Sequence, residues 1–150
     1  MMNKIFVDSN IIVYAYDRSE PEKQRRALAI LDYLTDARAG VISAQVMSEL
    51  FSAATRRIQI PLSPADAYQR LENYQQSWKI VSVTPEIVLE GVRGVRDYQF
   101  SLWDGQIWAA ARLNQITVVF SEDFSVGSVI EGVRFVNPLI DDFRIEEWVI

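Results

Sequence analysis

The chain contains neither cysteine nor histidine. Without cysteine it has no disulfide, no thiolate metal ligand and no cysteine nucleophile. Without histidine it cannot build a Ser-His-Asp or Cys-His catalytic system, the usual zinc sites, or the general base that most often works near neutral pH. Any chemistry must therefore depend on carboxylates, hydroxyls, amides, lysine or arginine.

Long hydrophobic runs and an excess of positive charge are also missing. No apolar run approaches the roughly 20 residues that a membrane-spanning helix needs. The opening segment 1–4 (MMNK) leads directly into a short strand-like stretch and not into the apolar core of a signal peptide, so we expect a cytoplasmic protein. A net charge of −5 argues against strong non-specific attraction to nucleic acid, although a local basic track or a metal-bridged phosphate is compatible with it.

The length is sufficient for one well-buried core. With 150 residues, 49% of them hydrophobic, the chain is too short for two ordinary domains, and it has no internal repeat or interdomain linker. We therefore expect a single domain over residues 1–150. Residues 139–150, an acidic and aromatic segment after Pro138, are expected to form a C-terminal extension.

Short apolar runs alternate with amphipathic segments along the chain. Strands are expected near 5–7, 41–42, 80–83, 117–120 and 133–136. Helices are expected from about residue 10, over 20–34, from a capping Ser43 to about 57, from Ser63, over 84–98 and over 101–111. This alternation predicts an α/β fold whose mostly parallel sheet is covered on both faces. Such sheets bind ligands at the carboxyl ends of their strands.

Four acidic residues stand where apolar runs end or begin, namely Asp8, Glu49, Asp104 and Asp123. Asp8 and Asp123 each follow an expected strand, which places both at the carboxyl edge of the sheet. Like charges at one site resist simultaneous ionisation unless a cation neutralises them, and hard oxygen ligands favour magnesium or manganese. If the fold brings the four acids together, they indicate a metal-dependent enzyme.

The residues around the first acid have structural explanations as well as functional ones. Asp8 is a suitable helix N-cap, because aspartate is a favoured capping residue. Asn10 also suits a cap or a turn, but its amide is equally suited to hold a water or to orient Asp8. The local sequence leaves both explanations open.

The other acids differ in what their surroundings indicate. Glu49 lies at the flank of its helix's apolar stripe, where it faces either solvent or a cleft. Asp104 precedes apolar residues at i+3, i+4 and i+7, so it heads the apolar face of its own helix and needs partners there, although a capping role is compatible with this. Asp123 has the alternative of an ordinary polar turn that uses side-chain hydrogen bonds. Ser121 beside it is suited to position a phosphate or a water. Glu122 is expected to be solvated.

Together these segments resemble the PIN-domain family, in particular the VapC-like ribonucleases of bacterial toxin–antitoxin pairs. The similarity lies in segments 7–12 (VDSNII), 43–50 (SAQVMSEL), 102–111 (LWDGQIWAAA) and 119–124 (VFSEDF), which carry the four acids in the family's order. Segment 136–138 (VNP) resembles the family's usual close. Trp103 departs from the pattern, because smaller or polar residues are frequent before the aspartate. The tail 139–150 extends past the usual end, where it is available to cover an interface or the cleft.

The resemblance implies an α/β/α sandwich with a five-stranded, mostly parallel sheet and a magnesium- or manganese-dependent endoribonuclease. Asp8, Asp104 and Asp123 would hold one or two ions, Glu49 would bind a second ion or orient the attacking water, and Asn10 and Ser121 would place the water or the phosphate. It also implies a homodimer and an antitoxin whose arginine or lysine enters the acidic cleft. Basic residues that are available to guide RNA, each also explained as part of a solvated helix face, are Arg25, Arg26, Arg56, Arg57, Arg93 and Arg96.

Two other functions are compatible with parts of the pattern. An aspartate-based phosphatase would use Asp8 as a nucleophile, but that class usually has a second acid two residues later, where this chain has Asn10. A non-catalytic protein-interaction module would keep the acids as helix caps and use the four tryptophans and the acidic, apolar tail for partner binding.

Overall fold

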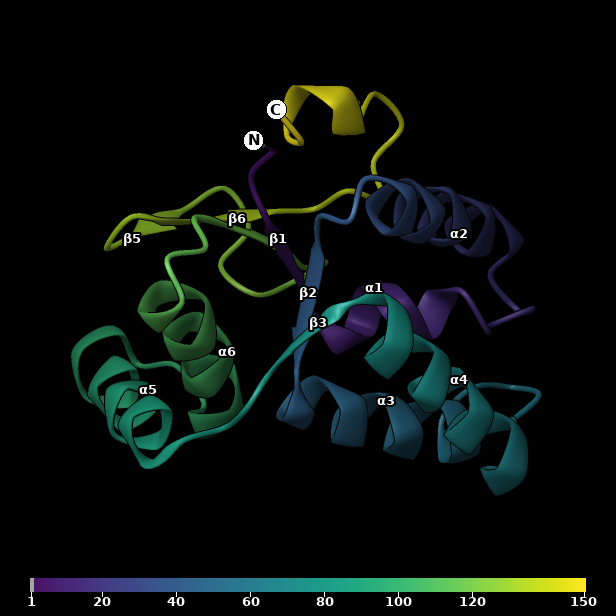
Figure 1. Cartoon of the computed structure of the whole chain (residues 1–150), viewed down its shortest axis with the longest axis horizontal. Helices are drawn as coiled ribbons and strands as arrows, with labels where there is room; N and C mark the ends of the chain where they lie inside the picture. The colour runs from purple at the N-terminus through teal and green to yellow at the C-terminus, as the bar shows by residue number, and fades with distance from the viewer. Residues whose placement is uncertain (1) are drawn as a thin grey trace.

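The computed structural model describes residues 2–150 and is built around one sheet. Its strands lie in the order β3-β2-β1-β4-β6-β5 (Figure 1). Their bounds are Ile5–Val7 for β1, Gly40–Ser43 for β2, Lys79–Val81 for β3, Val118–Phe120 for β4, Val129–Ile130 for β5 and Val133–Val136 for β6. Neighbouring strands from β3 to β6 are parallel, and β5 alone pairs antiparallel, with β6. The predicted mostly parallel α/β fold is confirmed.

The sheet has one strand more than the five that the sequence predicts. The additional β5 contains only two residues and is joined to β6 by Glu131 and Gly132. Both turn residues have positive φ, at 49° and 84°, as a two-residue hairpin turn of the type that matches strand twist requires. A two-residue strand is too short to show an alternating pattern, so this hairpin is visible only in the structure.

Helices cover both faces of the sheet. On one side lie α1 (Ser9–Tyr14), α2 (Pro21–Asp36), α3 (Ala44–Arg56) and α4 (Pro64–Ser77), and on the other lie α5 (Pro85–Tyr98) and α6 (Leu102–Leu113) (Figure 1). This division follows from the strand order, because right-handed crossovers from β1 to β2 and β3 run in one direction and the return from β3 to β4 runs in the other. Among residues 2–150, no helix is both long and apolar enough to cross a bilayer.

Side-chain caps start the helices where the sequence indicates. The hydroxyls of Ser43, Ser63 and Ser101 each accept a hydrogen bond from a backbone N–H in the first turn, and Thr84 does the same for α5. Asp8 caps α1 by accepting from the N–H of Ser9. These caps satisfy backbone donors that a helix leaves unpaired. The caps at Asp8, Ser43 and Thr84 therefore fix where α1, α3 and α5 begin after strands β1, β2 and β3.

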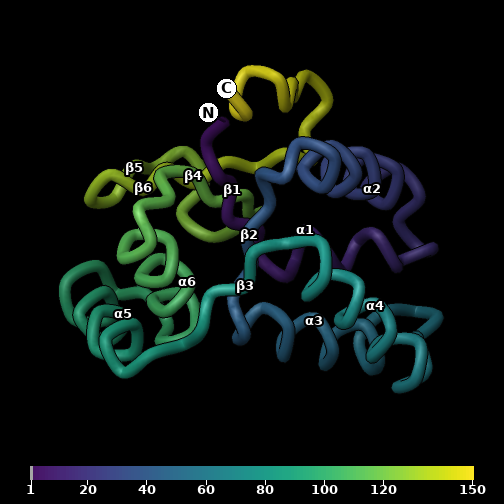
Figure 2. The backbone as a smooth tube through the Cα atoms, viewed as in Figure 1, coloured from purple at the N-terminus to yellow at the C-terminus, as the bar shows by residue number. Residues whose placement is uncertain are grey.

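The C-terminal tail packs at the opposite edge, near the amino end of β1. The Asn3 amide donates to the Trp148 carbonyl at 2.7 Å, and the Ile150 N–H donates to the Asn3 side-chain oxygen at 2.8 Å. Phe143 packs edge-to-face on Phe120 with ring centres 5.4 Å apart. Both termini accordingly lie side by side in Figure 2. The tail therefore does not cover the acidic residues that follow β1 and β4.

Helices α5 and α6 pack with almost no space between their backbones. A Cβ atom built on Gly105 would lie 2.5 Å from the carbonyl oxygen of Gly91, and one on Gly91 would lie 2.9 Å from the side chain of Gln106. Both contacts are shorter than any real Cβ contact, so larger residues would push the helices apart. Because Asp104 immediately precedes Gly105, this packing also sets the position of that acid.

We expect Gly105→Ala to destabilise the protein by about 1–3 kcal/mol, because the added methyl overpacks the α5–α6 contact. Without that clash, the same change would stabilise the helix by about 1 kcal/mol through higher helix propensity. The sign of the change in unfolding free energy, measured by urea denaturation, therefore distinguishes the two cases. A more stable variant would contradict the close packing.

Candidate active site

The ends of the two central strands bring the first and fourth sequence motifs together. Strands β1 and β4 pair in parallel with Val7 opposite Phe120, and the N–H of Asp8 continues the ladder by donating to the Phe120 carbonyl at 2.9 Å. Asp8 and Ser121 consequently leave the same edge of the sheet. Their side chains meet, because the Ser121 hydroxyl donates to Asp8 Oδ2 at 3.0 Å.

Asp8 is a carboxyl group buried without a cationic partner. Only 6% of its surface is exposed, and its other oxygen, Oδ1, accepts from the N–H of Ser9 at 2.7 Å. The pKa of Asp8 is raised from 3.8 to about 7, mainly by burial and also by the charges of Glu49 and Asp104, while the two hydrogen bonds oppose the increase. Asp8 is thus both the N-cap of α1 and a buried acid.

Asn10 connects the first and fourth motifs a second time. Its Nδ2 donates to Asp123 Oδ1 at 3.0 Å and to the Ser121 hydroxyl at 3.3 Å, while its Oδ1 accepts from the N–H of Glu122. Asp123 itself is exposed. The amide therefore orients both the serine that holds Asp8 and the exposed aspartate, which goes beyond a capping role.

Glu49 faces this edge and not bulk solvent. One oxygen accepts from the hydroxyl of Ser9 at 3.2 Å, and the other accepts from Nε2 of Gln45 at 3.3 Å. Gln45 is in turn held by Gln106 of α6, whose Nε2 donates to Gln45 Oε1 at 2.6 Å. Burial is the main cause of the raised pKa of Glu49, with a contribution from the charge of Asp104. Two amides thus link the glutamate helix α3 to the aspartate helix α6.

Asp104 lies in the first turn of α6, where its N–H donates to the capping hydroxyl of Ser101 at 3.1 Å. It is partly buried, and burial together with the charge of Asp123 raises the pKa of its carboxyl group. Asp104 in turn raises the pKa of both Asp8 and Glu49. Every one of the four acids therefore acts electrostatically on at least one of the others.

The acids do not form a ready-made coordination sphere. Among residues 2–150, no three acidic side chains are grouped closely enough to hold a metal ion. The carboxylates instead accept hydrogen bonds from Ser9, Ser121, Asn10 and Gln45. This arrangement is expected where like charges lack a counter-ion, because neutral donors then stabilise each one separately. The oxygen-only donors and the three raised pKa values fit a hard divalent cation.

A cleft of about 620 Å³ opens beside Glu49. Its walls come from α1, α3 and the first turn of α6, and they include Ser9, Asn10, Glu49, Arg57 and Trp103. A volume of this size is typical of small-molecule sites. Of the four acids, Glu49 lines this cleft, whereas Asp8, Asp104 and Asp123 are not among its lining residues.

Several charged residues have partners that the sequence does not indicate. Glu122 was expected to be solvated, but it accepts from the Tyr14 hydroxyl at 2.7 Å and pairs with Lys23 at 2.6 Å. Arg26 pairs with Asp141 of the tail, and Arg25 pairs with Glu22. The pairs of Lys23 and Arg26 join elements far apart in sequence, whereas that of Arg25 lies within α2. Both arginines are therefore paired and are not free cations that could meet RNA.

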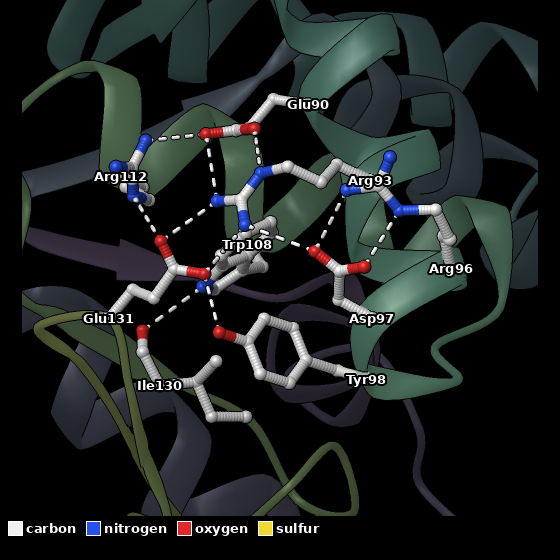
Figure 3. Close-up of polar contacts among 9 residues, drawn as sticks. All are labelled: Glu90, Arg93, Arg96, Asp97, Tyr98, Trp108, Arg112, Ile130 and Glu131. Carbon is white, nitrogen blue, oxygen red and sulfur yellow. Dashed lines mark hydrogen bonds and ion pairs between the residues drawn. The ribbon is translucent and has the colours of Figure 1, made fainter.

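Arg93 belongs to an ion-pair network that holds α5, α6 and the β5–β6 hairpin together (Figure 3). Its guanidinium pairs with Glu90 at 2.6 Å and with both oxygens of Glu131, at 2.8 and 2.9 Å. The same guanidinium lies over the ring of Trp108, 5.2 Å from its centre. Arg112 of α6 joins the network through Glu90 at 2.5 Å. Arg93 is thus a structural residue that supports the helix of Asp104.

The carboxyl edge of this sheet carries carboxylate and hydroxyl groups. In α/β proteins with an open parallel sheet, this edge is where ligands bind. A family model described as the PIN domain matches residues 5–128, which is most of the chain. The chain belongs to the PIN-domain family. A search of curated proteins gave no match.

Solved structures with a similar fold come from toxin–antitoxin systems. A toxin–antitoxin complex from Klebsiella pneumoniae is 20% identical with a TM-score of 0.64, and the match covers 90% of this chain and 98% of that one. VapC20 from Mycobacterium tuberculosis, a toxin that cleaves the sarcin–ricin loop, is 17% identical with a TM-score of 0.61, covering 85% and 98%. DNA-bound VapBC from Salmonella typhimurium is 15% identical with a TM-score of 0.61, covering 91% and 99%. At these identities the likeness concerns the fold.

Three supporting residues were missed by sequence reasoning, namely Ser9, Gln45 and Gln106. Gln45 stands one helical turn before Glu49, a spacing at which side chains meet, so its contact could have been anticipated. The contacts of Ser9 with α3 and of Gln106 with Gln45 join separate elements. No local pattern indicates them.

We expect the metal-free protein to lose stability as the pH rises through 7. Because the folded pKa of Asp8, about 7, exceeds its ordinary value of 3.8, the folded state binds an extra proton between these values. The resulting stabilisation is complete below about pH 4. It is lost as the pH rises to the folded pKa of about 7, because Asp8 ionises in the unfolded chain at lower pH than in the folded one, and the loss is on the order of 2–4 kcal/mol by pH 7.5. Urea denaturation in EDTA at pH 4.5 and 7.5 measures it.

Asp8→Asn provides the control, because its amide does not ionise. The variant should show a much smaller difference between the two pH values. Equal pH dependence in the variant and the native protein would contradict the assignment to Asp8.

Proposed function

We propose that the protein is a divalent-metal-dependent endoribonuclease that acts as the toxin of a toxin–antitoxin pair. The observation that carries the proposal is Asp8, a buried carboxyl group whose pKa is raised and which is surrounded by further acids instead of cations. Membership of the PIN-domain family supports the same function. So do similarly folded proteins, which include toxin–antitoxin complexes and a toxin that cleaves the sarcin–ricin loop.

Asp8, Asp104 and Asp123 would hold one or two Mg²⁺ or Mn²⁺ ions, with Glu49 as a ligand to a second ion or as the group that orients the attacking water. A divalent ion bound there supplies Lewis-acid activation of water and neutralises charge on the phosphate. Ser121 fixes Asp8 through its hydroxyl, and Asn10 orients Asp123 through its amide. Within this proposal the chain acts as one domain over residues 1–150.

An antitoxin and a second copy of the chain are the proposed protein partners. The net charge of −5 and the acidic cleft suit an antitoxin that inserts arginine or lysine. Helix α5 carries exposed apolar side chains at helical spacing, which suit a dimer interface, namely Val88, Leu89, Val92 and Val95. An aspartate-based phosphatase is disfavoured, because Asn10 stands where its second acid belongs and the chain matches the PIN family.

We expect Asp8→Asn and Asp104→Asn each to reduce RNA cleavage by at least about 100-fold, because each removes a carboxylate from the proposed metal site. The assay is cleavage of a structured RNA with magnesium or manganese, and Asp66→Asn on the exposed surface of α4 is the matched control. Circular dichroism should show that all variants are folded. Equal activity in the native protein and both site variants would sink the assignment.

We also expect magnesium or manganese to raise the melting temperature of the native protein at pH 7.5. A ligand at 100 times its dissociation constant stabilises the folded state by about 2.7 kcal/mol. Asp8→Asn should show a smaller increase, because it offers one ligand fewer. Calcium-free buffers with and without EDTA provide the baseline, and an identical shift in both proteins would contradict binding at Asp8.

In cells, expression of the chain should arrest growth, and co-expression of the neighbouring reading frame should relieve the arrest. Growth curves with native protein and Asp104→Asn measure this. Absence of toxicity together with partner binding would favour the non-catalytic interaction module.

A further inference from the structure

Trp103 exposes its indole at the rim of the cleft, directly before Asp104. It is 59% exposed, whereas Trp78 and Trp108 are buried at 6% and 0%. The core therefore does not explain this side chain. A large aromatic surface left in water beside acidic groups indicates a ligand that covers it.

One side chain, that of Gln45, holds both the backbone of Trp103 and the carboxylate of Glu49. Its carbonyl accepts from Nε2 of Gln45 at 2.9 Å, and the same amide nitrogen donates to Glu49 Oε2 at 3.3 Å. The oxygen of the Gln45 amide accepts a hydrogen bond from Nε2 of Gln106 at 2.6 Å. The indole therefore projects from a position fixed relative to the acidic residues.

Arg57, the residue that caps the C-terminus of α3, is the only lysine or arginine among the described residues that line the cleft. It makes no ion pair within residues 2–150, in contrast to Arg93, which pairs with Glu90 and Glu131. Its charge reaches the acidic site, because it lowers the pKa of Glu49. The cleft thus offers one free cation for an anionic group.

We infer that this cleft is a subsite for one unpaired nucleotide of RNA next to the scissile phosphate. Its base stacks on Trp103, and its phosphate pairs with Arg57. Stacking needs a base that is splayed out of a duplex, so the nucleotide bound in this subsite must be unpaired. It rests on the proposed ribonuclease function and adds the residues that select the substrate.

The lining of the cleft favours a nucleotide over an apolar protein segment. Hydroxyl groups of Ser9, Tyr14, Ser48 and Ser52 line it together with Glu49. An apolar helix docked there would bury the charges of Glu49 and Arg57 without compensating groups, which costs binding energy. A sugar and a phosphate supply both acceptors and donors for the hydroxyl groups, while the base covers the indole.

The test compares cleavage kinetics of a looped RNA by Trp103→Ala, Trp103→Phe, Arg57→Ala and Arg57→Lys. We expect the two alanine variants to raise KM about 10-fold or more, because each removes one contact to the flanking nucleotide. Trp103→Phe and Arg57→Lys should recover most of the affinity, since they keep a ring and a charge. Tyr68→Ala and Arg70→Ala on α4 are matched controls, exposed residues outside the cleft, and should match the native protein.

A binding measurement separates this inference from catalysis. In EDTA, where cleavage is not expected, an RNA oligonucleotide should protect native tryptophan fluorescence from acrylamide quenching, and Trp103→Phe should lose that protection. Protection without cleavage by the native protein would uphold the subsite and overturn the proposed ribonuclease activity. Cleavage with native KM in both alanine variants would overturn the subsite and leave the ribonuclease proposal intact.

A third outcome concerns the protein partner. If Trp103→Ala cleaves RNA like the native protein but no longer binds the antitoxin, the rim is a protein-docking surface, and the nucleotide subsite is wrong. Circular dichroism of each variant excludes loss of folding as the cause of any change. The exposed position of Trp103 makes such a loss unexpected.

Discussion

The structure depends on a carboxyl group buried at the end of its central strand. Asp8 follows β1, which is fully buried, and its two oxygens are held by the Ser9 N–H and the Ser121 hydroxyl. These neutral donors do not compensate for the loss of hydration, so burial raises the pKa of Asp8. A cation at this position would offset the cost of burying the ionised carboxylate. The charges of the surrounding acids increase that cost, because like charges repel. Folding thus leaves unfavourable negative potential at the edge of the sheet where the proposed metal site lies.

The rest of the fold maintains that arrangement from both sides. The glycine contact between α5 and α6 and the Arg93 network fix the helix that carries Asp104. On the other side, Gln45 and Ser9 attach the helix of Glu49. The C-terminal tail closes the amino edge through Asn3, far from the acids. The glycine packing and the ion pairs therefore support α6 from the side of α5, while Asp8 and Glu49 are held by hydrogen bonds from neutral donors.

Several arginines are engaged in ion pairs, whereas Arg57 is not. Arg25, Arg26, Arg93 and Arg96 all make ion pairs with nearby carboxylates. Arg57 lines the same cleft as Glu49 without such a pair in the described chain, so it is the positive charge that the cleft offers to an anion. Under the proposed function, a net charge of −5 would limit non-specific binding of RNA and leave its recognition to the cleft.

By itself, the sequence determined the α/β class, the five parallel strands, the helix starts and the order of the four acidic motifs. These depend on periodicity and on caps such as Ser43 and Ser101, which act between residues close in the chain. Only the tertiary structure decided that Glu49 faces the cleft, that Glu122 pairs with Lys23, that β5 exists and that the tail lies at the amino edge. Each of these joins side chains or strands that meet only after the sheet has formed, and no local pattern encodes such a meeting.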